Sequence, residues 1–163
     1  MTPILSICIP TYNRLDILRN TILSIYADLG NVSMEDFEVV VSDNSKEHTT
    51  QPIISEFKYS NLHYYITECE GFKNSFYALS YGKGDFLKLN NNYTMFKKGT
   101  LKILINQLKS LRDSRSQVIY TNGLCKKKRK RLLTIVLRNI LMVFLIFALG
   151  VQAMACGRLI LIR

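Results

Sequence analysis

Short apolar runs and longer segments of helical periodicity alternate along most of the chain. Runs rich in Ile, Val, Leu and Phe predict buried strands at residues 4–9, 37–41, 62–66, 86–89 and 118–120. Apolar positions that recur every three or four residues predict helices at residues 15–29, 53–57, 73–81 and 101–111. Strands and helices that alternate in this order indicate an α/β fold, in which helices cover both faces of a mostly parallel sheet.

Polar side chains gather where three of the predicted strands end. The three clusters are Pro10-Thr11-Tyr12-Asn13, Ser42-Asp43-Asn44-Ser45 and Asn90-Asn91-Asn92. Each cluster by itself is also typical of an ordinary loop. Because parallel sheets bind ligands at the carboxyl ends of their strands, the three clusters together predict a ligand site at that edge of the sheet.

The positive charge of the chain is confined to its last part. The formal net charge is +10, but residues 1–124 carry 13 Lys and Arg against 12 Asp and Glu, whereas residues 125–163 carry 9 Lys and Arg and no acid. This change predicts one nearly neutral domain at 1–124, followed by a basic and aliphatic tail at 125–163. The charge of the domain therefore gives no support to nucleic-acid binding.

The motifs at the strand ends resemble those of a known enzyme family. Pro10 to Arg14 reads Pro-Thr-Tyr-Asn-Arg after an aliphatic strand, which resembles the opening signature of family 2 glycosyltransferases with the GT-A fold. Val40 to Ser45 is similar to the second-strand motif of that family, and Gly71 to Gly84 resembles its following segment. The resemblance covers residues 4 to 120 and implies a Rossmann-like GT-A domain. It also implies that a sugar passes with inversion from a nucleoside diphosphate sugar to a polysaccharide or lipid-linked acceptor, such as O antigen or capsule.

The resemblance also assigns donor-binding residues. Thr11 and Tyr12 are expected to line the base and ribose, and Asp43 is expected to accept a hydrogen bond from the base. A Tyr ring can stack on a base, and a carboxylate at a strand end can bind an imide N–H. The alternative for Asp43 is a turn residue whose side chain bonds its own backbone. The remaining expected donor-binding residues are Pro10, Asn13 and Asn74.

One motif departs from the family pattern. After its fourth strand the family presents Asp-x-Asp, which holds a divalent cation at the diphosphate, whereas this chain reads Leu89-Asn90-Asn91-Asn92-Tyr93. Asn90 and Asn92 are the expected ligands of Mg²⁺ or Mn²⁺. Hard cations prefer charged oxygen ligands, so we expect weaker metal binding than with carboxylates. Asp85, at the start of that strand, is expected to be a turn residue.

The sequence does not supply an obvious general base. In the family this carboxylate lies in the C-terminal half, and here no Asp or Glu follows Asp113. We therefore expect a partial chain, weakly active or inactive, that contains the donor site. The alternative from another class is a noncatalytic, membrane-associated protein that uses a degenerate nucleotide-binding fold to bind a partner.

Three explanations for the tail remain open. A basic hexamer at Lys126–Arg131 precedes an apolar run at Ile140–Val151, so a membrane helix near 132–155 is one of them. The others are a basic amphipathic segment on the membrane surface and translation out of frame after about residue 124. Because Met1 to Pro10 lacks the basic start of a signal peptide, we expect a cytoplasmic domain, at the inner face of the membrane if the tail inserts.

Overall fold

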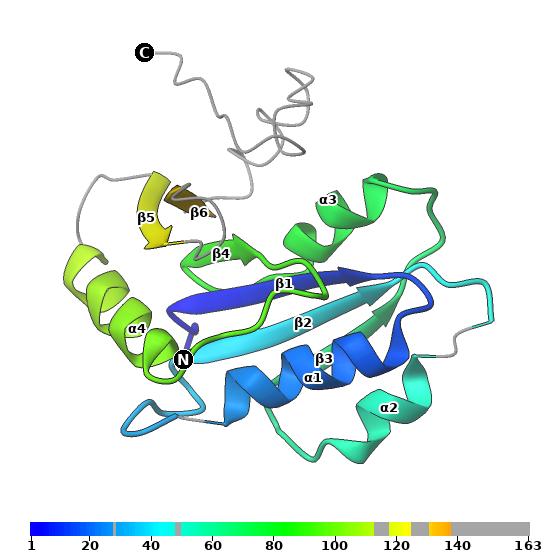
Figure 1. Ribbon diagram of the computed structural model, residues 1–163, viewed down its shortest axis with the longest axis horizontal. Coiled ribbons are helices and arrows are strands. Elements are labelled where there is room, and N and C mark those ends of the chain that lie inside the picture. Colours follow the sequence, from blue (N-terminus) through cyan, green and yellow to red (C-terminus); the bar gives the residue numbers. More distant parts are fainter. Residues whose placement is uncertain (28, 48–49, 113–117, 125–130, 138–163) are drawn as a thin grey trace, which may run out of the picture.

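The computed structural model describes residues 1–27, 29–47, 50–112, 118–124 and 131–137, with side chains described as far as residue 112. Strands and helices alternate along these residues, as the sequence predicts (Figure 1). The helices are α1 (Leu15–Tyr26), α2 (Gln51–Glu56), α3 (Lys73–Ser80) and α4 (Thr100–Leu111). The strands are β1 (Leu5–Thr11), β2 (Phe37–Asp43), β3 (Leu62–Ile66), β4 (Phe86–Leu89), β5 (Val118–Leu124) and β6 (Arg131–Leu137).

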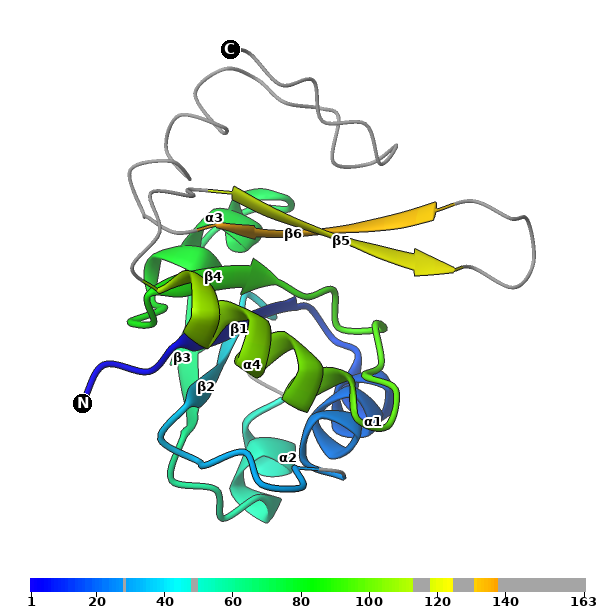
Figure 2. The same ribbon diagram turned by 90° about the vertical axis from the view of Figure 1, so that its left-hand side faces the viewer.

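The strands form one sheet in the order β3-β2-β1-β4-β6-β5. The first four strands are parallel, with Leu5 opposite both Phe37 and Phe86. β6 runs antiparallel to β4 and to β5, and Figure 2 shows β5 and β6 as a long ribbon beside β4. The prediction of a mostly parallel sheet in an α/β fold is confirmed.

The sequence did not predict β6. Residues 132–137, the first part of the expected membrane segment, are strand residues in the structure, because their apolar run pairs with β4 and β5. Residues 138–155, on which the membrane prediction mainly depends, lie outside the described residues. Within the described residues, no helix has the length and apolar character needed to cross a membrane.

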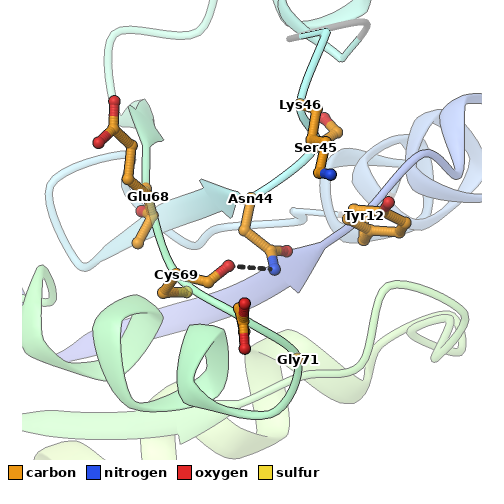
Figure 3. A pocket seen from close by; sticks show the side chains of 9 residues that line it. Tyr12, Asn44, Ser45, Lys46, Glu68, Cys69 and Gly71 are labelled. Atoms are coloured by element: carbon orange, nitrogen blue, oxygen red, sulfur yellow. Dashed lines mark hydrogen bonds between the residues drawn. The ribbon is translucent and has the colours of Figure 1, made fainter.

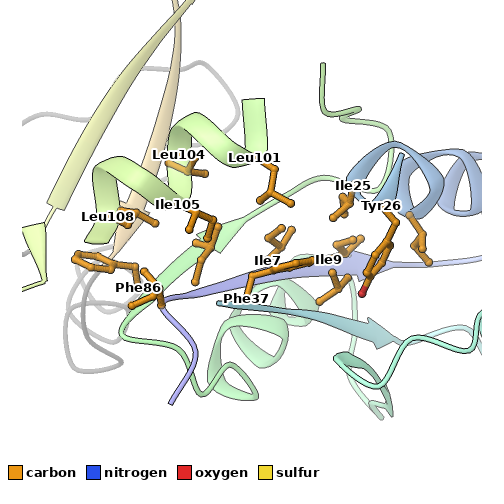
Figure 4. Close-up of a cluster of buried hydrophobic side chains, with 14 of the residues drawn as sticks. Ile7, Ile9, Ile25, Tyr26, Phe37, Phe86, Leu101, Leu104, Ile105 and Leu108 are labelled. Carbon is orange, nitrogen blue, oxygen red and sulfur yellow. The ribbon is translucent and has the colours of Figure 1, made fainter. Parts of the chain in front are cut away.

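Helices cover both faces of the sheet because alternate strand residues point to opposite sides. On one face, Ile7 and Ile9 of β1 pack with buried side chains of α1 and α4 (Figure 4). On the other face, Cys8 and Val40 pack against Ala78 of α3. In Figure 1, α1 and α2 lie below the strands and α3 lies above them.

The helical periodicity of the sequence corresponds to buried stripes. Leu18, Ile22 and Ile25 of α1 are almost fully buried, and so are Leu101, Leu104, Ile105 and Leu108 of α4. Burying one such aliphatic side chain stabilises a fold by about 1.5–3 kcal/mol. The two stripes hold the helices on the sheet and leave the strand exits available for loops that carry polar residues.

A buried carboxylate organises the opposite edge, where the strands begin. Glu38 Oε1 accepts hydrogen bonds from Ser6 Oγ at 2.6 Å and from the backbone N–H of Lys83 at 2.5 Å. Gly84 packs so closely there that a Cβ atom would lie 2.7 Å from the backbone nitrogen of Ser6. These contacts fix the start of β4 against β1 and β2.

Candidate functional site

The exits of β1, β2 and β3 surround a pocket of about 800 Å³. One ring and two loops line it: Tyr12, Asn44, Ser45, Lys46, Thr67, Glu68, Cys69, Glu70 and Gly71. Figure 3 shows Tyr12 on one side and Glu68 and Cys69 on the other, with Asn44 between them. Tyr12 is 51% exposed and lines the pocket, so its side chain is accessible to a ligand.

A buried amide joins the parts of this pocket. The Asn74 side-chain N–H groups donate to Thr11 O at 3.1 Å, Ser42 O at 2.9 Å and Asn44 Oδ1 at 2.9 Å. Its own Oδ1 accepts a hydrogen bond from Ser42 Oγ at 2.6 Å. Asn44 in turn donates to Cys69 O at 3.1 Å (Figure 3). Asn74 therefore lies beneath the pocket and positions Asn44, while its amide hydrogens are already engaged.

Asp43 is fully buried at the end of β2. Its Oδ1 accepts hydrogen bonds from the backbone N–H of Ser45 at 2.9 Å and from the Ser45 hydroxyl. Its Oδ2 accepts one from the Tyr64 hydroxyl at 2.8 Å. The bond to the backbone two residues ahead is the turn arrangement that the sequence offered as the alternative. The two roles are compatible, and base recognition by Asp43 stays a prediction.

The acidic neighbour also affects Tyr64. Burial, together with the hydrogen bond to the Asp43 carboxylate, raises the pKa of the Tyr64 hydroxyl above its usual value. The hydroxyl is therefore a donor at neutral pH. It holds the carboxylate in one orientation toward β3.

The expected donor-binding residues of β1 lie at its exit, but they differ in exposure. Thr11 is buried, and its carbonyl oxygen accepts a hydrogen bond from the backbone N–H of Asn44 at 3.2 Å. Pro10 is half-buried and lies opposite Ser42 in the sheet. Asn13 is exposed and has a φ of 49°, a left-handed conformation that Asn tolerates and that turns the chain into α1. Of these residues and Tyr12, Tyr12 is the one that lines the pocket.

The loop after β4 is fastened to the same exit. Asn92 Nδ2 donates to Thr11 Oγ1 at 3.2 Å, and its backbone carbonyl accepts from Thr21 Oγ1 at 2.6 Å. The backbone N–H of Asn90 donates to Cys8 O at 2.8 Å. The structure thus brings the third polar cluster beside the first, as the strand pattern predicts.

The oxygen of Asn90 is occupied by a lysine. The Lys88 ammonium donates to Asn90 Oδ1 at 2.6 Å, and Asn90 Nδ2 donates to Thr94 O at 3.0 Å. Both Lys88 and Asn90 are buried, and the ammonium lies 5.2 Å from the centre of the Phe96 ring. Burial lowers the pKa of Lys88 to about 8, so the side chain is mainly charged at neutral pH.

This donor set does not fit a divalent ion held by Asn90 and Asn92 together. A cation at Asn90 Oδ1 would lie beside the charged Lys88 ammonium, which repels it, and the side chains of Asn90 and Asn92 are neutral amides. Within the described residues, no three His, Cys, Asp or Glu side chains lie close enough together to hold a metal ion. Asp85 lies at the other end of β4, where its carboxylate pairs with Arg112 at 2.9 Å, so it is not a substitute ligand.

Sequence reasoning missed one wall of the pocket and the buried lysine. Residues 67–71 follow β3 and include Glu68 and Glu70, so the strand-exit rule applied to the third strand would have found them. Lys88 stands alone within an apolar strand, and no spacing pattern marks it.

Comparisons with known proteins agree with this architecture. A family model described as glycosyl transferase family 2 matches residues 6–153. The validoxylamine A glucosyltransferase of Streptomyces hygroscopicus subsp. jinggangensis (strain 5008) is 39% identical over 56 residues, which is 34% of this chain and 13% of that protein.

Two solved structures share the fold. The mannosyltransferase PcManGT of Pyrobaculum calidifontis, in complex with GDP-Man and Mn²⁺, has a TM-score of 0.67 at 16% identity, over 92% of this chain and 47% of that one. S. aureus TarS 1–349 in complex with UDP-GlcNAc has a TM-score of 0.60 at 18% identity, over 90% of this chain and 47% of that one. The chain thus spans less than half the length of these relatives. The match of the family model over most of its residues shows that the chain belongs to glycosyl transferase family 2.

Proposed function

We propose that this domain binds a nucleoside diphosphate sugar and serves a glycosyltransferase that passes the sugar, with inversion, to a polysaccharide or lipid-linked acceptor such as O antigen or capsule. Family membership supports a transferase. The two relatives above are bound to GDP-Man and to UDP-GlcNAc, which supports a donor of this chemical class.

The observation that carries the proposal is the pocket at the carboxyl edge of β1, β2 and β3. Ligands of open parallel sheets bind at this edge. In the proposal, the base stacks on the exposed Tyr12 ring, and the loops at Asn44 and Gly71 enclose the other side. Pro10, Thr11, Asn13 and Asn74 act mainly by fixing the backbone around that ring.

In this proposal, Asp43 is the group that recognises the base. Its Oδ2 accepts one hydrogen bond, from Tyr64, and a carboxylate oxygen has a second lone pair. An imide N–H that reaches the end of β2 would share this oxygen with Tyr64. Because Asp43 is fully buried, such contact requires the Ser45 turn to move aside.

The chemical step is displacement at the anomeric carbon of the donor sugar. The acceptor hydroxyl needs a general base, and a positioned base contributes roughly 10² to 10⁴ in rate. The sequence contains no Asp or Glu after Asp113, and we assign no residue to this role. In the proposal, these 163 residues bind the donor and do not turn it over.

The support for a divalent cation comes from a relative and not from the residues of this chain. One relative carries Mn²⁺ in its structure, so a metal is plausible for the family. In this chain we propose no metal bridge through Asn90, because its oxygen already accepts a hydrogen bond from Lys88. Asn92 alone offers a neutral amide, which gives a weak ligand.

Calorimetry with UDP and GDP sugars tests the proposal. Tyr12→Ala is expected to weaken nucleotide binding by about 1–3 kcal/mol, the contribution of stacking one base on an aromatic ring. The matched control is Tyr77→Ala, since Tyr77 is also partly exposed and lies outside the pocket. Equal losses for the two variants, or no loss for either, would remove Tyr12 from the site.

A noncatalytic binding protein is the second candidate. The neutral Asn90-Asn91-Asn92 motif favours it, because the loop lacks the acids that usually hold the cation. Slow hydrolysis of a nucleotide sugar in the absence of acceptor would favour the transferase. Contact with the inner face of a membrane is part of either proposal and depends on residues 138–163, which lie outside the described residues.

A further inference from the structure

Lys88 is a buried positive charge in the middle of the sheet. Its exposed fraction is 7%, and it lies in β4 between the buried Leu87 and the half-buried Leu89. One ammonium hydrogen bonds Asn90 Oδ1 at 2.6 Å, and the Phe96 ring lies 5.2 Å away. Nothing in the hydrophobic packing of β4 requires a lysine at this position.

The charge has no anionic partner in the described part of the chain. The ion pairs there involve Arg19, His63, Lys109 and Arg112, and none involves Lys88. A neutral amide and an aromatic face compensate only part of the hydration that the ammonium loses on burial. A buried ion that lacks an opposite charge is strongly unfavourable, so the arrangement suggests a site for an anion that comes from outside the chain.

Lys88 does not line the pocket, but its contacts connect it to the exit of β1 beside the pocket. Asn90, which accepts its hydrogen bond, is held against β1 through Cys8 O, and Asn92 is held through Thr11 Oγ1. Tyr12, whose ring lines the pocket, directly follows Thr11 in the chain. A nucleotide whose base lies on Tyr12 would extend its diphosphate past this exit. The field of a charge in a low-dielectric interior is screened much less than in water.

We propose that Lys88 is the resident cation of the donor site: its ammonium takes the Asn90 oxygen that a divalent metal would need, and supplies positive charge to the nucleotide's diphosphate in place of that metal. The proposal rests on nucleotide binding as described above and extends it. In this proposal, Asn90 orients the Lys88 ammonium and does not bind a metal ion.

The test is the affinity of the whole 163-residue chain for UDP and for uridine, each measured in EDTA and in Mg²⁺. We expect UDP to bind at least tenfold more tightly than uridine in EDTA, and Mg²⁺ to change the dissociation constant of UDP less than twofold. Lys88→Met should weaken UDP binding about tenfold and leave uridine binding unchanged, a factor that corresponds to roughly 1.4 kcal/mol. The control is Lys97→Met, an exposed lysine in the loop that follows β4, which should leave both affinities unchanged.

Two results would overturn the proposal. One is equal affinity for UDP and uridine in EDTA. The other is a tightening of UDP binding by tenfold or more in Mg²⁺ that Asn90→Ala abolishes, since Asn90 would then ligate the ion. Neither result requires the Lys88→Met variant, so the proposal can be tested even if that variant does not fold.

A metal-only measurement separates this proposal from nucleotide binding. Absence of any UDP or GDP binding would refute the proposed function, and Mn²⁺ added without nucleotide would then decide the role of Asn90. The readout is the side-chain amide signal of Asn90 in nitrogen-15 NMR spectra, compared with that of the exposed Asn91. Selective broadening of the Asn90 signal by Mn²⁺ overturns the exclusion of a metal at Asn90. Equal signals for the two amides support that exclusion alone, since the role of Lys88 toward a diphosphate is refuted together with nucleotide binding.

Discussion

The hydroxyl of Tyr64 lies 2.8 Å from Asp43 Oδ2 and donates a hydrogen bond to this buried carboxylate. The bond connects the middle of β3 to the end of β2, directly below the pocket. Any contact between Asp43 and a ligand is therefore made while one carboxylate oxygen accepts a hydrogen bond from Tyr64. The pair therefore gives a way to separate the turn role of Asp43 from base recognition.

Tyr64→Phe removes this donor and leaves the ring in place. A hydrogen bond to a charged group contributes about 1.5–3 kcal/mol, and we expect a loss at the lower end of that range because the bond is only partly buried. If Asp43 reads the base, affinity for UDP should stay equal or increase, since Oδ2 is freed. Urea unfolding and calorimetry provide the two measurements.

Asp43→Ala is expected to weaken the binding of UDP by about 1.5–3 kcal/mol, the scale of a hydrogen bond to a charged group. It also leaves the Ser45 N–H without its acceptor, so stability should decrease. Asp43→Asn is the better comparison, because the amide keeps an oxygen for the Ser45 N–H. Unchanged UDP affinity in a folded Asp43→Asn variant would leave Asp43 with its turn role alone.

Asn74→Ala is expected to destabilise the protein and to weaken nucleotide binding together. The variant removes the hydrogen bonds of Asn74 to Thr11 O, Ser42 Oγ and Asn44 Oδ1 and leaves Asn44 Oδ1 without its partner; a buried polar group left unpaired costs about 1–3 kcal/mol. Asn91→Ala, at an exposed amide, is the control. Nucleotide affinity that persists in a stable Asn74→Ala variant would contradict the role of Asn74 in positioning Asn44.

Gly84→Ala should destabilise the fold without changing the pocket. The added Cβ would lie 2.7 Å from Ser6 N and 2.9 Å from the Leu5 carbonyl carbon, and such overpacking typically costs about 1–3 kcal/mol. The site lies at the other edge of the sheet, so the remaining folded protein should bind UDP normally. Thermal unfolding measures the first effect, and an unchanged melting temperature would show that the backbone there adjusts easily.

The depressed pKa of Lys88 predicts how stability depends on pH. The folded-state pKa is about 8 and the usual value is 10.5, so between these values the unfolded state binds more protons than the folded state. The contribution of Lys88 to the free energy of unfolding should therefore increase as pH rises from 8 toward 10.5. Burial raises the pKa of the Cys8 thiol, which has the opposite effect on stability. Cys8 is present in both the wild type and Lys88→Met, and the part of its pKa shift that Lys88 causes belongs to the measured difference. The measurement is the difference between these two proteins in urea at pH 7.5 and 9.5, and no change in that difference would contradict the prediction.

We also expect no appreciable transferase turnover from the 163 residues, even with nucleotide bound. Without a positioned acceptor, a barrier contribution of about 7–11 kcal/mol is missing. The measurement is release of nucleoside diphosphate from several nucleotide sugars, with lipid acceptors and Mg²⁺ or Mn²⁺ present. Robust release that depends on acceptor would show that the chain contains a base and an acceptor site.

Much of the fold could be predicted because buried apolar positions recur at regular intervals along the sequence. The alternation of Ile7, Cys8 and Ile9 between two faces, and the helical spacing of Leu18, Ile22 and Ile25, reflect periods of two and 3.6 residues. β6 was missed because its apolar residues precede the aliphatic run at Ile140–Val151, and the two were interpreted together as one membrane segment.

The candidate site was predicted in position and only partly in detail. The strand-exit rule located Tyr12 and the loop at Asn44, since topology alone brings strand ends together. It could not show that Asp43 and Asn74 lie beneath the pocket with their polar atoms engaged, because those partners come from other elements. The contact between Lys88 and Asn90 likewise depends on side-chain direction and burial, which sequence spacing does not give.

The strand order also has a consequence for the order of folding. The residues that line the pocket lie between Tyr12 and Gly71, at the exits of β1, β2 and β3. These three strands follow one another along the chain and pair as neighbours in the sheet. Leu5 of β1 must then find Phe86 of β4, a pairing of much greater sequence separation. Contacts that close long loops form more slowly than local ones. We expect the aromatic half of the site to assemble before the lysine of β4 joins it, so a pulse of hydrogen exchange during refolding should protect Val40 earlier than Leu87.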